Sequence, residues 1–169
     1  MAETQVLFVC TANICRSPTA EAVMRKYVQE AGLHGRVFVD SAGTHDFHIG
    51  APPDPRAQAA ARRRGYDLTA LRARQVTPED FEKFDLVLGM DFNNLAALHD
   101  ISPTQYRHKI GLLMPYAKRR RASIIHDPYA RSTKDFDLVL DYIEDACSGL
   151  VETLSRNELS HGAEMSAYK

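Results

Sequence analysis

The 169-residue sequence has only three cysteines, no long apolar run and almost no net charge. Three cysteines cannot all pair, so a disulfide-rich secreted scaffold is excluded and reduced thiols are expected. No apolar run approaches the roughly 20 residues that a membrane-spanning helix needs. Lys and Arg number 21 against 22 Asp and Glu, so the broad basic field of a nucleic-acid-binding protein is missing. We therefore expect a protein that binds neither membranes nor nucleic acid.

The first five residues, MAETQ, lack the basic and apolar regions of a secretory signal. This predicts a cytoplasmic protein with reduced thiols. The composition that remains, 44% hydrophobic and 25% charged, is typical of a soluble globular protein. The length suits one domain, which we place at residues 1–155, followed by a polar tail at 156–169 that we expect to be disordered.

Short apolar runs alternate with amphipathic segments along the chain. Buried strands are predicted at 6–9, 37–39, 86–90 and 110–113, with a turn away from the second strand at 41–44. Helices are predicted at 18–31, 54–65, after 77, after 91 and from about 135. Strands that alternate with helices predict an α/β fold, with a parallel sheet covered by helices on both faces as a three-layer sandwich.

The most informative stretch runs from residue 6 to residue 18. Its apolar residues 6–9 predict a buried strand that Cys10 ends, and five residues then separate Cys10 from Arg16. Ser17-Pro18 predicts a helix start, because serine caps a helix well and proline suits its first turn. In a parallel α/β sheet this loop lies at the carboxyl end of a strand, where ligands bind.

This arrangement suits a phosphate or a similar oxyanion. Inward-facing amide N–H groups and a helix N-terminus form an anion cradle, and Arg16 adds two parallel charge-assisted hydrogen bonds. The same positive field favours the thiolate of Cys10 as a nucleophile beneath the bound phosphorus, with the Ser17 hydroxyl as a hydrogen-bond donor to the sulfur. A plainer interpretation also stays open, namely a buried cysteine with Arg16 as a surface charge, because this spacing often arises by chance.

Residues 9–18, VCTANICRSP, resemble the signature loop of the low-molecular-weight protein tyrosine phosphatases. The resemblance covers most of residues 5–155 and continues at SAGT (41–44), DPRA (54–57), ARQ (73–75), GMD (89–91) and DPY (127–129). Together with right-handed crossovers, it implies a four-stranded sheet in the order 2-1-3-4. It also implies an enzyme that needs neither a cofactor nor a metal.

The resemblance assigns roles to individual residues. It implies that Cys10 is the nucleophile and that Arg16 binds the phosphate. Asp127 falls on the family's general acid, although an Asp-Pro pair taken alone indicates only a turn. Asn13 is implied to organise the loop, with Ser41 in the same supporting network. The remaining residues of the phosphate-binding loop are Thr11, Ala12, Ile14, Cys15 and Ser17.

Two aromatic residues, Phe47 and Tyr129, are implied to form opposite walls of the pocket. A flat slot between two rings would accept a phenyl phosphate, whereas phosphoserine is too short to gain those contacts. Packing of either ring against its own loop is the alternative. The chain departs from the family pattern at Ala130, where many members carry a second tyrosine, and at Leu71, where some carry a histidine. These departures bear on substrate preference and loop stability.

Other candidates carry weaker signals. Cys15 is a small buried side chain, and the resemblance supports the hypothesis that it captures oxidised Cys10 as a reversible disulfide. Cys147 occupies a core position of the last helix. His45 and His48 have a spacing that metals use but no third ligand, so no metal site is predicted. The basic run at 118–121 is interpreted as a solvated face, or as a surface that attracts acidic phosphopeptides.

These observations together predict a protein tyrosine phosphatase. It would hydrolyse phosphotyrosine proteins and small aryl phosphates through a cysteinyl-phosphate intermediate, with Asp127 as general acid and base. An arsenate reductase on the same fold is one alternative, but it needs further cysteines as a relay and only Cys147 is at hand. A non-catalytic phosphotyrosine-binding module is the other, and it would need Arg16 but neither Cys10 nor Asp127.

Overall fold

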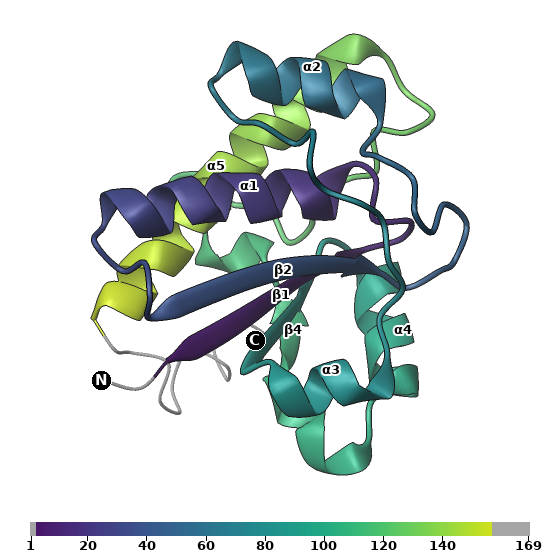
Figure 1. The fold of residues 1–169 in the computed structure, drawn as a ribbon, viewed down its shortest axis with the longest axis vertical. Coiled ribbons are helices and arrows are strands. Elements are labelled where there is room, and N and C mark those ends of the chain that lie inside the picture. Colours follow the sequence, from purple (N-terminus) through teal and green to yellow (C-terminus); the bar gives the residue numbers. More distant parts are fainter. Residues whose placement is uncertain (1–2, 157–169) are drawn as a thin grey trace.

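The computed structural model describes residues 3–156, which form a parallel sheet between two layers of helices (Figure 1). The strands are β1 (Thr4–Cys10), β2 (Val37–Gly43), β3 (Leu86–Gly89) and β4 (Ile110–Leu112). All pairs are parallel and the order is β2-β1-β3-β4, so the predicted order is confirmed. Most of the predicted tail, residues 157–169, lies outside the described residues.

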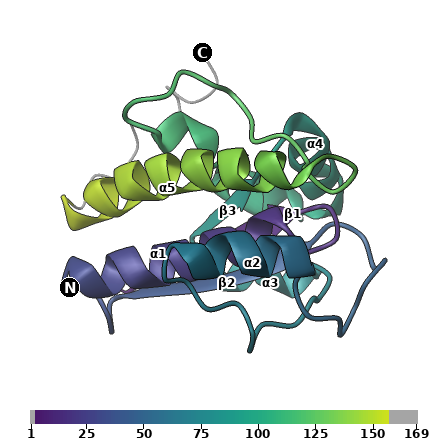
Figure 2. The same cartoon turned by 90° about the horizontal axis from the view of Figure 1, so that it is seen from above.

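Helices α1 (Arg16–Glu30), α2 (Pro55–Arg63) and α5 (Thr133–Ser155) pack together on one side of the sheet. Figures 1 and 2 both show α1 and α5 side by side. Helices α3 (Pro78–Lys83) and α4 (Phe92–Ile101) lie on the other side, and η1 (Thr104–Lys109) and η2 (Met114–Tyr116) are short 3₁₀ turns. Within residues 3–156 no helix is long and apolar enough to cross a membrane.

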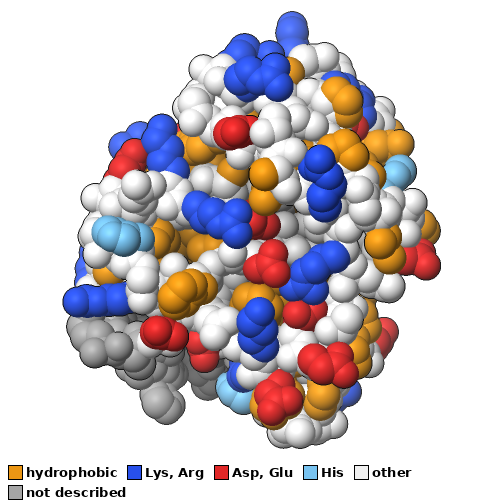
Figure 3. All heavy atoms as spheres, in the orientation of Figure 1, with side chains coloured by type: hydrophobic (Ala, Val, Ile, Leu, Met, Phe, Trp, Pro, Cys, Tyr) orange, Lys and Arg blue, Asp and Glu red, His pale blue; other side chains and the backbone are white. Residues whose placement is uncertain are grey.

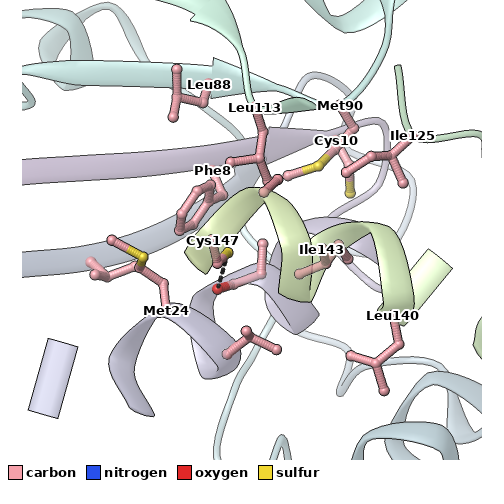
Figure 4. Packing of buried hydrophobic residues seen from close by; sticks show 14 of the residues in the cluster. Phe8, Cys10, Met24, Leu88, Met90, Leu113, Ile125, Leu140, Ile143 and Cys147 are labelled. Atoms are coloured by element: carbon pink, nitrogen blue, oxygen red, sulfur yellow. Dashed lines mark hydrogen bonds between the residues drawn. The ribbon is translucent and has the colours of Figure 1, made fainter. Parts of the chain in front are cut away.

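Strand β1 lies between β2 and β3 and is buried on both faces. Because successive side chains of a strand point to opposite faces, Val6 and Phe8 enter the core beneath α1 and α5, while Leu7 and Val9 enter the core beneath α3 and α4. All four side chains are fully buried. Figure 4 shows Phe8 in the first of these layers, close to the helices that cover it. The carboxyl end of β1 is therefore a rigid base for the loop that follows it.

Two of the element boundaries that differ from the sequence prediction lie beside that loop. The expected turn at 41–44 is wrong as far as residue 43, because β2 continues in register with β1 until Gly43 pairs with Cys10. A Cβ on Gly43 would lie 2.8 Å from the backbone oxygen of Thr11, so glycine lets the loop approach the strand. Helix α1 begins at Arg16, with residue 15 at its cap, so Ser17 lies inside the first turn.

The basic run at 118–121 packs onto the acidic side of α5. The backbone N–H groups of residues 118–120 donate hydrogen bonds to the carboxylate of Asp145, and Lys118 pairs with Glu152 at 2.7 Å. Figure 3 likewise shows basic and acidic side chains interspersed over the visible face. Acidic side chains of the protein's own helix α5 therefore lie beside this basic run.

Candidate active site

Cys10 lies at the floor of the loop that joins β1 to α1, residues 10–17, called the Cys10 loop below. Its side chain is 3% exposed, and its Sγ lies 3.0 Å from the Oγ of Ser17. The Ser17 hydroxyl can face the sulfur because Ser17 stands in the first turn of α1 instead of capping it. The thiol therefore combines burial, a helix N-terminus and a hydroxyl partner.

Asn13 holds the Cys10 loop in shape. Its φ of 59° is the only positive φ of a non-glycine residue between residues 3 and 156, and asparagine tolerates this left-handed conformation better than most residues. Its Nδ2 donates hydrogen bonds to the Oγ of Ser17 at 2.7 Å and the Oγ of Ser41 at 3.0 Å. Its Oδ1 accepts a third from the backbone N–H of Arg74 at 3.0 Å. The expected supporting network of Asn13 and Ser41 is present.

This network continues to a buried carboxyl group. The Oγ of Ser41 donates a hydrogen bond to the Oε1 of Glu21 at 2.7 Å, and Glu21 is 3% exposed. Burial raises the pKa of Glu21, although the Ser41 hydrogen bond and nearby Arg25 act against that rise. A chain of short contacts thus runs from Glu21 through Ser41, Asn13 and Ser17 to the Cys10 sulfur.

Arg16 is 1% exposed and its guanidinium is held from three sides. Its Nη1 donates to the Oδ2 of Asp91 at 2.6 Å and to the backbone oxygen of Ile125 at 2.8 Å, and its Nη2 lies 3.5 Å from the Oγ1 of Thr11. Asp91 also caps α4, where its Oδ1 accepts from the backbone N–H of Asn94. A fixed guanidinium presents its remaining donors to an oxyanion without further ordering.

Asp127 stands on an irregular segment, residues 125–131, called the acid loop below. Its side chain is about half exposed, and its Oδ2 lies 3.8 Å from the Nη2 of Arg16. Its Oδ1 accepts a hydrogen bond from the backbone N–H of Tyr129 at 3.0 Å. The loop is tied to the end of β3 because the N–H of Ile125 donates to the oxygen of Met90. The carboxyl group thus lies beside Arg16 in the lining of the same cavity as Cys10.

These groups surround a cavity of about 170 Å³. The aromatic rings of Phe47 and Tyr129, which are 63% and 50% exposed, line it together with His48. The ring of His48 lies 6.3 Å from that of Tyr129, and Phe47 stacks on His45 with ring centres 4.8 Å apart. The cavity therefore combines Cys10 and Arg16 of the Cys10 loop with an aromatic rim.

Cys15 is buried in the same loop, with an exposed fraction of 5%. Burial raises the pKa of its thiol well above the ordinary range, and the negative charge of Asp54 raises it further. Cys10, Cys15 and Cys147 are all free thiols in the structure. Cys15 is therefore a poor nucleophile in this state, and the hypothesis of a Cys10–Cys15 disulfide stays a prediction.

The structure brings most of the predicted site residues to one cavity. Its lining contains Cys10, Thr11, Ala12, Ile14, Cys15, Arg16, Phe47, Asp127 and Tyr129. Asn13 and Ser17 belong to the Cys10 loop but are not in the lining, and their side chains support the loop from within. From the sequence, Asp91 was placed only in the GMD motif before a predicted helix, and its pairing with Arg16 was missed. His48 was also missed as part of the wall, because no pattern in the sequence marks either contact.

Comparisons with known proteins agree with this geometry. The family model described as low molecular weight phosphotyrosine protein phosphatase matches residues 5–160. The low molecular weight phosphotyrosine protein phosphatase of Homo sapiens is 42% identical over 153 residues, 89% of this chain and 96% of its own length. A crystal structure of a protein tyrosine phosphatase from Entamoeba histolytica, with Hepes in its active site, has a TM-score of 0.90 and 38% identity. That match covers 93% of this chain and 100% of the other.

A third related structure contains a ligand that resembles an aryl phosphate. Vibrio vulnificus Wzb in complex with benzylphosphonate has a TM-score of 0.78 and 29% identity, over 89% of this chain and 98% of its own. The match to the family model spans nearly the whole chain, and the human relative exceeds 40% identity along almost its full length. This chain therefore belongs to the low molecular weight phosphotyrosine protein phosphatase family.

Proposed function

We propose that this protein hydrolyses phosphotyrosine in proteins, and small aryl phosphates, through a cysteinyl-phosphate intermediate on Cys10. One observation carries the proposal: Cys10, Arg16 and Asp127 line a single cavity at the carboxyl end of the sheet. The Hepes and benzylphosphonate found with two related proteins are oxyanions or their mimics, which supports an oxyanion as the group bound by the loop.

In the first step, the Cys10 thiolate attacks phosphorus, and an S–P bond forms as the bond to the phenolic oxygen breaks. Asp127 gives its proton to that oxygen, so phenol leaves as a neutral molecule. The buried guanidinium of Arg16 and the amide groups of the loop stabilise the charge on the other phosphate oxygens. The Ser17 hydroxyl, 3.0 Å from the sulfur, stabilises the thiolate before attack.

In the second step, the Asp127 carboxylate accepts a proton from water as the water oxygen attacks phosphorus. The S–P bond breaks, the electron pair returns to the Cys10 sulfur, and inorganic phosphate leaves. Asp127 is protonated again at the end of the cycle. The proton gained from water in this step is the one donated in the next cycle, so the scheme needs no external reductant or oxidant.

The aromatic rim supports tyrosine over serine as the phosphorylated residue. The rings of Phe47 and Tyr129 line the cavity above the Cys10 loop, and a phenyl phosphate would stack between them. A phosphoserine side chain would place its phosphate at the same depth only if its backbone entered the slot. We therefore propose phosphotyrosine proteins as partners and a free oxyanion as a competitive ligand.

The arsenate-reductase alternative is not favoured. Cys147 is fully buried in α5 and its sulfur faces the backbone oxygen of Ala20, as Figure 4 shows. It does not line the cavity that contains Cys10. A disulfide relay from Cys10 to Cys147 would therefore require the core to open.

The proposal is tested by hydrolysis of 4-nitrophenyl phosphate and of a phosphotyrosine peptide in the presence of a chelator. We expect turnover by the wild type, none by Cys10→Ser, and about 10²–10⁴-fold less by Asp127→Ala. Acid quenching of Asp127→Ala during turnover should trap phosphate on the protein, and this signal should be absent in Cys10→Ser. A wild type that binds the phosphopeptide without turning it over would establish a binding module, and arsenate reduction alone would establish the other alternative.

A further inference from the structure

The acid loop has few contacts that fix the Asp127 carboxyl group. The loop is tied at its start by Ile125, and it runs into α5 through the capping box of Ser132. Between these points Asp127 is about half exposed, and its carboxylate contacts the N–H of Tyr129 and, at 3.8 Å, the guanidinium of Arg16. The backbone before Asp127 is held by Ile125 and by His126, whose Nε2 lies 3.5 Å from Asp135, so the position of this carboxyl group also depends on what holds the backbone after it.

Arg56, in the first turn of α2, reaches that part of the backbone. Its Nη2 donates a hydrogen bond to the backbone oxygen of Tyr129 at 2.9 Å, and its Nη1 lies 3.4 Å from the oxygen of Arg131. Its guanidinium also lies over two rings, 5.6 Å from the centre of Tyr129 and 4.6 Å from that of Phe136. One side chain thus contacts two carbonyls and one ring of the acid loop.

Arg56 is anchored on its other side to the residue that caps α2. Its Nε and Nη2 lie 3.1 and 2.9 Å from the two carboxylate oxygens of Asp54. Burial raises the pKa of Asp54, but the hydrogen bonds and charge of Arg56 outweigh that effect and hold it below the ordinary value. Asp54 is in turn joined to the Cys10 loop, because its N–H donates to the backbone oxygen of Ile14 at 2.8 Å.

We infer that Arg56 is a positioning residue that couples the acid loop to the Cys10 loop and so holds Asp127 above the sulfur. Its fork of donors bridges a carboxylate on one side and backbone carbonyls on the other, a geometry that a lysine cannot reproduce. Arg56 does not line the cavity, so any effect it has on catalysis passes through the acid loop, which carries both Asp127 and Tyr129. The inference rests on the proposed role of Asp127 as the general acid.

The test compares kcat/KM for a series of aryl phosphates whose phenols range from acidic, such as 4-nitrophenol, to weakly acidic, such as phenol. A well-placed acid makes the rate insensitive to the leaving group. We expect Arg56→Met to lose about 10–100-fold on phenyl phosphate but less than about 3-fold on 4-nitrophenyl phosphate. Arg56→Lys should fall between the wild type and Arg56→Met. Arg63→Met is the matched control, because Arg63 joins α2 to Asp137 of α5 and should leave every ester within about 2-fold.

A double-mutant cycle provides the sharper readout. In an Asp127→Asn background no acid remains to be positioned, so Arg56→Met should cause less than about 3-fold further loss on phenyl phosphate. Inhibition by inorganic phosphate should stay within about 3-fold of the wild type in Arg56→Met, which shows that the loop is intact. Equal losses of Arg56→Met on all esters, or losses that multiply with those of Asp127→Asn, would overturn the inference. A steep leaving-group dependence in the wild type itself would instead refute the general-acid role of Asp127.

Discussion

Asn13 offers the most quantitative prediction, because its side chain and its backbone make separable contributions to the Cys10 loop. Asn13→Ala removes three hydrogen bonds, those to Ser17, Ser41 and the backbone of Arg74. It also leaves a residue with a Cβ, but without the local hydrogen-bonding side chain, at a φ of 59°. Asn13→Gly removes the same three hydrogen bonds, while glycine adopts positive φ freely.

The expected loss follows from these contacts. Three hydrogen bonds at about 1 kcal/mol each give about 3 kcal/mol, and the left-handed backbone adds about 1 kcal/mol for alanine. Asn13→Ala should therefore lower the free energy of unfolding by about 4 kcal/mol. Glycine avoids the backbone term but adds entropy to the unfolded chain, so Asn13→Gly should be the more stable variant by about 0.5–1 kcal/mol.

Urea denaturation of the three proteins at one pH measures these differences, provided that the slopes with urea agree. The comparison of the two variants is the decisive part, because both lose the same hydrogen bonds. An alanine variant as stable as the glycine variant, or more stable, would refute the argument that the positive φ constrains this position. A loss below about 1 kcal/mol in both would refute the argument that the buried hydrogen bonds hold the loop.

Three further predictions concern the surroundings of the loop. Gly43→Ala should lower the free energy of unfolding by about 1–3 kcal/mol and reduce kcat/KM for phenyl phosphate, since its Cβ would lie 2.8 Å from the oxygen of Thr11; unchanged kinetics would contradict this. Asp91→Ala leaves the buried guanidinium of Arg16 without its nearer carboxylate, so thermal denaturation should show a loss of about 3 kcal/mol, and a variant as stable as the wild type would show that the pair contributes nothing. Burial raises the pKa of Glu21 in the folded state. Its contribution to the free energy of unfolding is therefore most favourable below the ordinary glutamate pKa of about 4.3, and it is lost as pH rises through the raised pKa. Glu21→Gln should abolish that part of the pH dependence of the urea midpoint, and an unaltered pH profile would argue against it.

Local patterns in the sequence determined the elements of the sheet and the identity of the key loop. The four apolar residues before Cys10 fill both core layers as a central strand must. Asp54 caps α2 at the predicted start of that helix, and Thr77 starts α3 with a capping box. These features depend on residues a few positions apart, so hydrophobic period and capping chemistry suffice to find them.

Tertiary structure alone decided which distant groups meet at the loop. Arg16 pairs with Asp91 and with Ile125, which follow it by 75 and 109 residues, and no local pattern marks partners so far apart. Arg56 meets the acid loop 73 residues later for the same reason. The end of β2 also differed from prediction, because Gly43 pairs with Cys10 and approaches the backbone of the Cys10 loop closely. The sequence by itself determined which chemically active residues are available. The assembly of the parallel sheet decided which side chains hold them in place, because it brings the carboxyl ends of the strands to one edge.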